Sequence, residues 1–214
     1  DKGLIARDYV PKSEYKWSKT YKPSPSFVSI HLGVAKELID KNFNCHHIIV
    51  EDWEELENEK GVIFISIPTL LDSSLAPVDK HIIHAFTPSS IYEWEHLSRD
   101  EYLIKKQKYY SFLIGKISNI IPNLNENIAH KEIGTPRTHR KFLGRFEGSY
   151  GPIPNKKLLG LLPMPFNSTR VENLYCVGDS CFPGQGLNAV AFSGYACAHK
   201  IGSKLNINSF KLPD

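Results

Sequence analysis

The feature that most constrains this sequence is a glycine-bearing loop near its C-terminal end. The surrounding residues predict a strand, a tight loop and an alanine-rich helix, in the order 173–177, 178–186 and 187–205. Asp179 follows the strand, and Gly184 and Gly186 precede the helix. A carboxylate there accepts hydrogen bonds from sugar-like hydroxyls, a helix start offers unpaired N–H groups, and glycine lets backbone approach a flat ring. The segment suits a polyol joined to an electron-accepting ring; the alternative is a turn that merely connects strand and helix.

The same loop matches a dinucleotide-binding pattern, which we reject. Gly184-Gln185-Gly186-Leu187-Asn188-Ala189 reads G-x-G-x-x-A. The dinucleotide fingerprint also requires a following strand that ends in an acidic residue about 20 positions further on. Residues 207–214 contain a proline and no β-type run. The glycines therefore do not indicate a complete nucleotide-binding βαβ unit.

Upstream, the apolar pattern predicts a second region built from strands and helices. Strands are predicted at 45–50, 62–67, 82–86 and 128–133, and we expect the second and third of these to pair. From Val28 to Ile39 apolar residues recur at helical spacing, which predicts a helix. Segments without an apolar period are expected to be an exposed connection, an acidic surface loop and a loop rich in Gly, Pro and Arg: 12–26, 52–60 and 134–155.

The longest helix is predicted to begin after Ser98. Ser98 and Glu101 have the spacing of a capping box, and Pro122 stops the pattern after Ile121. The side chains expected on its apolar side are Leu103, Phe112, Leu113, Ile117 and Ile120. Its other face carries lysines and tyrosines that either are solvated or contact an anionic lipid surface: Lys105, Lys106, Lys108, Tyr109, Tyr110 and Lys116.

Composition excludes several classes of protein. Of 214 residues, 41% are hydrophobic and 23% are charged, which is enough apolar sequence for a buried core. The net charge of +3 comes without a basic stripe, so nucleic acid is not an expected partner. The 4 cysteines are too few for a disulfide scaffold, and we expect a reducing compartment. Because the chain starts at Asp1 without Met, we expect a fragment of a longer protein.

Two further groups of residues are candidate sites. Cys45-His46-His47, Cys176 with Cys181, and Cys197 with His199 lack the spacing of a structural zinc site, so buried or half-buried thiols are the favoured interpretation and no metal is expected. Three basic residues, Arg137, His139 and Arg140, are candidates for handling a proton or negative charge. The alternative is that they belong to a solvated loop with Lys141, Arg145 and Glu147.

The C-terminal segment resembles the flavin-binding motif of carotenoid cis-trans isomerases, which belong to the phytoene desaturase-like FAD oxidoreductases. The resemblance rests on residues 174–194, Leu-Tyr-Cys-Val-Gly-Asp-Ser-Cys-Phe-Pro-Gly-Gln-Gly-Leu-Asn-Ala-Val-Ala-Phe-Ser-Gly. It extends upstream through residues 66–77, 134–140 and Tyr150-Gly151-Pro152, and covers roughly residues 30–203 in register.

This resemblance implies a cofactor and the residues that hold it. The cofactor is reduced FAD; Asp179 holds the ribityl chain, and residues 184–189 pass beneath the edge of the isoalloxazine ring. The implied cofactor-binding residues are Gly178, Asp179, Phe182, Pro183, Gly184, Gln185, Gly186, Leu187, Asn188 and Ala189. Members of the family also carry an N-terminal βαβ unit for the ADP half of FAD. We expect this chain to lack that unit and to be inactive by itself.

The resemblance also implies a fold and a domain organisation. The expected fold class is α+β / α/β, the C-terminal part of a Rossmann-like FAD-binding domain with a mixed-sheet substrate domain. Residues 1–25 are an exposed connection, 26–157 a portion of the substrate domain, and 158–214 the strand, loop and helix of the FAD-binding domain.

The implied function is conversion of poly-cis lycopene to the all-trans isomer, with no net redox change. The substrate is an apolar polyene, and peripheral membrane contact is expected. The implied location is a plastid membrane, or the cytoplasm or thylakoid membrane of a cyanobacterium. The alternatives are a carotene desaturase, a retinol-saturase-like reductase and a truncated, non-catalytic domain.

Overall fold

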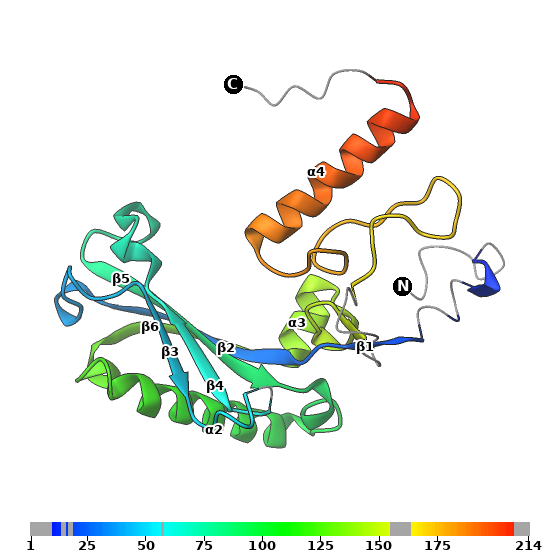
Figure 1. Ribbon diagram of the computed structural model, residues 1–214. Coiled ribbons are helices and arrows are strands. Elements are labelled where there is room, and N and C mark those ends of the chain that lie inside the picture. The colour runs from blue at the N-terminus through cyan, green and yellow to red at the C-terminus, as the bar shows by residue number, and fades with distance from the viewer. Residues whose placement is uncertain (1–9, 14–15, 17–18, 57, 155–163, 208–214) are drawn as a thin grey trace. The chain divides into compact units, whose positions relative to one another are not determined.

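The computed structural model describes residues 10–13, 16, 19–56, 58–154 and 164–207. The chain divides into two compact units. One comprises Pro25–Gly148, and the other Asp1–Ser24 together with Ser149–Asp214 (Figure 1). We describe each unit by itself. The expected division at residues 26 and 158 into substrate and FAD-binding portions stays a prediction.

A five-stranded sheet forms the centre of the unit Pro25–Gly148. Its order is β3-β4-β5-β2-β6, and all of its pairs are antiparallel, rather than mixed as expected. The predicted strands are confirmed, including the pairing of the second with the third, which are β4 and β5. The strands are β2 (Ser26–Ala35), β3 (His46–Val50), β4 (Val62–Ser66), β5 (Lys80–Ser89) and β6 (Ile128–Gly134).

The helix predicted from Val28 to Ile39 is wrong, because these residues form β2 and a short 3₁₀ turn. Val28, Ile30, Leu32 and Val34 alternate along the strand and are all buried. β2 pairs with β5 on one side and β6 on the other. The alternation of apolar residues at every second position outweighs their helical spacing, because this central strand forms backbone hydrogen bonds with both neighbouring strands.

The helix α2 (Arg99–Ser118) runs along one face of the sheet (Figure 1) and closes the core. The capping box of Ser98 and Glu101 is confirmed. The predicted apolar side is wrong at Leu103, which is 49% exposed. The side chains that α2 buries are Tyr109, Tyr110, Leu113, Ile114 and Ile117.

A second helix, α3 (Pro136–Leu143), lies where a loop was predicted. Thr135 and Thr138 form a reciprocal cap, and Pro136 occupies the first turn. Gly144 follows in a left-handed conformation, with φ 62°. Proline, glycine and arginine here are the start, end and surface of a helix. Short 3₁₀ helices complete this unit: η2 (Lys36–Leu38), η3 (Pro68–Leu70), η4 (Ser73–Leu75), η5 (Ile91–Glu93), η6 (Leu124–Asn127) and η7 (Phe146–Gly148).

The other unit contains the two-stranded pair β1 (Tyr21–Pro23) and β7 (Pro152–Pro154), and the helix α4 (Leu187–Lys204). The predicted C-terminal helix is confirmed. The predicted strand at 173–177 is wrong: Tyr175 forms a single bridge with Ser168, and the segment has no ladder among the described residues. A strand needs a neighbour along its whole length, which the described part of this unit does not provide. None of the helices in the described ranges has the length and hydropathy needed to cross a membrane.

Candidate functional site

The loop before α4 has a backbone conformation that requires glycine. Gly178, Gly184 and Gly186 have φ angles of 105°, 111° and 101°, a region that L side chains rarely adopt. A Cβ added at Gly178 or Gly186 would meet nothing within 4 Å. The glycines therefore leave open space beside the start of α4, as the close approach of a ligand requires.

Hydrogen bonds that Asn167 donates and Ser193 accepts fix the segment that leads into this loop. The amide nitrogen of Asn167 donates to the carbonyl oxygen of Cys176 at 3.0 Å and to Oγ of Ser193 at 3.0 Å. Ser193 belongs to α4, is fully buried, and accepts from the backbone N–H of Gly178 at 3.3 Å. The loop and the helix behind it are thus joined by one polar cluster.

Tyr150 and Gly151, far from the loop in sequence, also contact it. The side-chain amide of Gln185 donates to the carbonyl oxygen of Tyr150. A Cβ at Gly151, which has φ 113°, would lie 2.8 Å from the carbonyl oxygen of Asp179. Two of the segments that carry the family resemblance, 150–152 and 174–194, therefore meet in space.

The predicted cofactor residues lie together around the start of α4, although their assignment to a flavin stays a prediction. Gly186 is the N-terminal cap of α4 and supplies no side-chain hydrogen bond there. Asp179 is half-buried and accepts a hydrogen bond from Oγ of Ser180 at 3.4 Å. The other predicted residues follow in order along the loop and the first turn: Phe182, Pro183, Gly184, Gln185, Leu187, Asn188 and Ala189. Open backbone, a carboxylate and a helix start fit the ring and ribityl side of FAD.

Two thiols, Cys176 and Cys181, flank Asp179 in sequence and are joined by a hydrogen bond. Cys176 is exposed and Cys181 is buried. A hydrogen bond from the Cys181 thiol lowers the pKa of Cys176 to about 6, and the same contact with burial raises the pKa of Cys181. All four cysteines are free. In the parts of the chain that the structure describes, no three His, Cys, Asp or Glu side chains form a group that could hold a metal.

The face of the five-stranded sheet away from α2 carries a row of aromatic rings that sequence reasoning missed. Phe64 and Phe86 stack across β4 and β5 with ring centroids 5.0 Å apart, and Phe27 meets Phe86 edge-on at 5.0 Å. His31 stacks on His84 at 4.5 Å. These residues alternate with the buried core residues along β2, β4 and β5. The alternation of aromatic and core residues in the three strands was therefore the sequence signal that could have predicted this face.

His84 is held neutral on this face. Burial and the neighbouring His31 lower the pKa of His84 to about 4. The row therefore combines aromatic rings with an uncharged imidazole, a surface that suits a flat, apolar ligand better than an ion.

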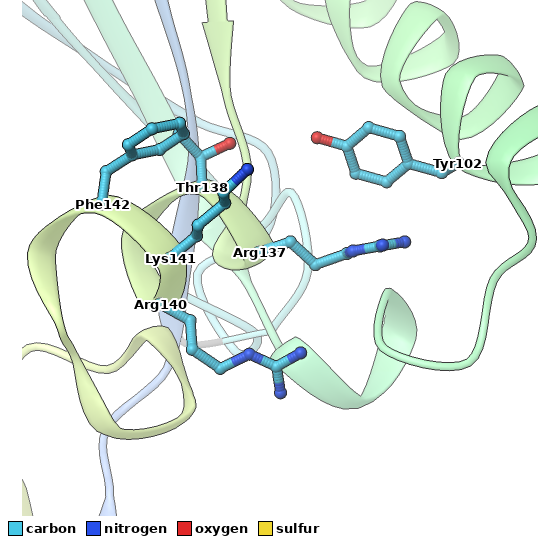
Figure 2. A pocket seen from close by; sticks show the side chains of 6 residues that line it. All are labelled: Tyr102, Arg137, Thr138, Arg140, Lys141 and Phe142. Atoms are coloured by element: carbon cyan, nitrogen blue, oxygen red, sulfur yellow. The ribbon is translucent and has the colours of Figure 1, made fainter.

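The structure separates the three basic candidates. Arg137 and Arg140 line a cavity of about 370 Å³ with Tyr102, Thr138, Lys141 and Phe142 (Figure 2). His139 lies on another side of α3, where its ring donates to the backbone of Phe27 and burial lowers its pKa. The structure therefore brings together the two arginines and not the histidine.

The lysine and tyrosine face proposed for α2 is only partly available. Tyr109 and Tyr110 are buried in the core. Lys105 forms an ion pair with Glu93 at 3.0 Å, and Lys116 forms one with Glu51. This leaves Lys106 and Lys108 of the proposed set, too few for a continuous basic face.

Comparison with known proteins bears out the resemblance stated from the motifs. The chain is 50% identical to the chloroplastic prolycopene isomerase of Arabidopsis thaliana over 206 residues, which is 95% of this chain and 35% of that protein. It is 49% identical to the chloroplastic prolycopene isomerase of Daucus carota over 206 residues, 95% of this chain and 34% of that protein. The chain therefore spans about a third of the length of these relatives.

More distant similarity extends to a bacterial enzyme of carotenoid chemistry. The 4,4'-diaponeurosporene oxygenase of Staphylococcus aureus is 25% identical over 199 residues, 88% of this chain and 39% of that protein. A solved oxidoreductase from Methanosarcina mazei aligns with a TM-score of 0.47 and 13% identity, covering 94% of this chain and 38% of that one. No protein-family model matches the chain.

Proposed function

We propose that this chain is the C-terminal portion of a flavin-dependent carotenoid cis-trans isomerase. It is about 50% identical in sequence to prolycopene isomerases over 95% of its length. The complete protein converts poly-cis lycopene to all-trans lycopene without net redox change. The observation that carries the proposal is the open, glycine-built loop at the start of α4, with Asp179 beside it, in a chain with this similarity.

The cofactor in this proposal is reduced FAD. When bound, it supplies the electron, proton or hydride that transiently lowers the order of a conjugated double bond, because rotation is blocked while the π bond is intact. The carboxylate of Asp179 accepts hydrogen bonds from the ribityl hydroxyls. The first-turn N–H groups of α4 at Leu187, Asn188 and Ala189 stabilise negative charge at the ring edge. In this proposal, residues 164–207 belong to the C-terminal part of a Rossmann-like FAD-binding domain.

The polyene lies, in our proposal, on the aromatic face of the sheet. The rings of Phe27, Phe64 and Phe86 offer a flat, apolar surface, and aromatic contacts of this kind stabilise a conjugated chain without fixing its configuration. His84, uncharged at neutral pH, adds no ion that would need solvation. The sheet with α2 is then the substrate portion of the protein, and Arg137, His139 and Arg140 remain candidates for proton handling.

We further infer that the protein works at a plastid membrane. The relatives from Arabidopsis thaliana and Daucus carota are named as chloroplastic. A lipid-dissolved polyene requires peripheral contact with the bilayer. A cyanobacterial cytoplasm or thylakoid membrane is the alternative location.

A decisive experiment uses the longest gene product that contains this chain. Reconstituted with FAD and reduced, it should convert poly-cis lycopene to the all-trans isomer, followed by chromatography, without consuming an electron acceptor. Stoichiometric consumption of an acceptor would instead identify a desaturase or a retinol-saturase-like reductase. A product that retains no flavin and no activity would support a non-catalytic domain.

A further inference from the structure

The segment from α3 through η7 exposes large apolar side chains beside basic ones. Phe142 is 73% exposed, Leu143 58% and Phe146 59%, within a single short stretch. Exposed aromatic and aliphatic residues grouped in this way are costly in water and mark interaction surfaces. Arg140, Lys141 and Arg145 lie among them in sequence.

The cavity beside these apolar residues is lined by cations. Arg137, Arg140 and Lys141 of α3 contribute to it, opposite Tyr102 of α2 (Figure 2). The guanidinium of Arg137 lies 4.7 Å from the centroid of the Tyr102 ring and donates to the carbonyl oxygen of Leu97 at 3.3 Å. Both contacts orient the group, and neither is with an acidic side chain.

Acidic groups compensate this charge only in part. Arg140 forms an ion pair with Glu95 at 3.4 Å, and Glu95 also faces His96 at 3.4 Å. Glu147 of η7 accepts from the hydroxyl of Tyr92 at 2.9 Å. Lys141 lies over the ring of Phe142, 5.1 Å from its centroid. The cavity therefore keeps a net positive charge that suits a phosphate diester.

We propose that residues 136–148 are a docking surface for an anionic lipid bilayer, with Phe142, Leu143 and Phe146 at the acyl boundary and a phospholipid headgroup in the cavity. Basic and exposed apolar side chains on one short amphipathic helix are the combination that binds anionic membranes. The inference rests on the proposed function, because a polyene substrate is dissolved in lipid and the protein must contact a bilayer to reach it. It assigns the contact to α3, and not to the lysines of α2.

The test is co-sedimentation with vesicles of phosphatidylcholine alone or mixed with phosphatidylglycerol. It uses the 214-residue chain and the longest gene product that contains it. Binding should require phosphatidylglycerol and weaken as salt rises. The double variant Arg140→Gln/Lys141→Gln should bind about 25-fold more weakly, since each basic residue near an anionic surface contributes about a fivefold gain.

A matched control removes the same charge from α2. Lys106→Gln/Lys108→Gln should bind like the unmodified chain, whereas Phe142→Ser/Phe146→Ser, which keeps every charge, should bind weakly. Far-UV circular dichroism establishes that each variant is folded. Equal loss in the α2 control, or full binding by both variants of residues 136–148, overturns the proposal.

Two further outcomes would also overturn it. If millimolar inorganic phosphate displaces the vesicles at constant ionic strength, the cavity is a site for a soluble anion. If the 214-residue chain binds but the longer product does not, the surface is covered by another part of the same protein. Because the assay needs neither flavin nor turnover, failure of the isomerase proposal leaves its result interpretable, and the reverse also holds.

Discussion

Gly151 lies so close to Asp179 that a Cβ on the glycine would stand 2.8 Å from the aspartate carbonyl oxygen. The backbone of Gly151 also has φ 113°, so both space and conformation exclude a side chain. The residue before β7 thus sets how closely the β1–β7 pair approaches the loop before α4.

Gly151→Ala should therefore move the loop and weaken flavin binding in the complete protein. The strain of a non-glycine residue at this φ is about 1–3 kcal/mol, before any contact is broken. The measurement is the ratio of flavin to protein absorbance after gel filtration. Gly194→Ala is the control: Gly194 lies in α4 with nothing within 4 Å of its Cβ position, so it should keep its flavin. Equal retention in both variants would contradict the prediction.

Asp179→Ala should lower FAD retention in the complete protein. Loss of a charge-assisted hydrogen bond costs about 1.5–3 kcal/mol, which corresponds to a tenfold or greater weakening. Asp179→Asn, which keeps the shape and one oxygen, should lose less. The dissociation constant of FAD, measured by flavin fluorescence, ranks the three proteins. Ser180→Ala, which removes the hydroxyl that donates to Asp179, is the matched control and should change it little.

Gly186→Val should abolish flavin binding and leave the far-UV circular dichroism nearly intact. The Cβ of the valine would meet no neighbour within 4 Å, but valine cannot easily adopt φ 101°. The disturbance should therefore stay local to the start of α4. A variant that binds FAD normally would show that this loop is only a connection.

Stability should fall in mild acid, in part through His84. Its pKa in the folded chain is lowered to about 4 by burial and by His31, whereas the unfolded value is about 6.5. The unfolded state therefore takes up the proton first, so stability is full above about pH 6.5 and declines as the pH falls towards 4. His81 and His139, whose pKa values burial also lowers, act in the same direction.

Urea unfolding at several pH values measures this decline. His84→Gln should flatten the profile between about pH 6.5 and 4, since glutamine does not titrate there. His96→Gln is the control, because His96 has an 88% exposed side chain. If the His84 variant keeps the whole slope, the decline belongs to other groups.

The 214-residue chain by itself should bind FAD and flavin mononucleotide equally weakly and should not isomerise poly-cis lycopene. The loop before α4, which lies in the described residues, is the one that we propose for the ring and ribityl side, and the two flavins share that side. Titration with each flavin, followed by fluorescence, tests this. A strong preference for FAD would place an adenosine site within the chain.

Sequence alone predicted the parts of the fold whose signals are local. The capping box of Ser98 and Glu101 located the start of α2, and the glycines located the loop before α4. Val28 to Ile39 was wrongly predicted as a helix because its apolar residues fit both periods, and only pairing with β5 and β6 decides for a strand. In α3, proline and glycine looked like a loop although each occupies a helix end.

The candidate site also combines features with local sequence signals and contacts between residues distant in sequence. The position of the loop before α4 could be predicted because its residues are contiguous. The contact between Gly151 and Asp179 could not, because sequence spacing does not measure how closely two backbone segments approach. The stacked pair His31 and His84 depends on the register of β2 against β5, which a single sequence does not state.

The hydrogen bonds of the Asn167 side-chain amide bear on how this segment can pass from one protein to another in evolution. Its hydrogen bonds reach Cys176 and Ser193, so the loop is organised mainly by sequence on either side of it. A segment that carries most of its organising contacts in its own sequence can be transferred between proteins together with the few partners that it still needs, here Tyr150 and Gly151. Grafted into a host that supplies an adenosine-binding unit, residues 150–152 and 164–207 together would bring the loop that we propose for the flavin, and a host aspartate alone would not.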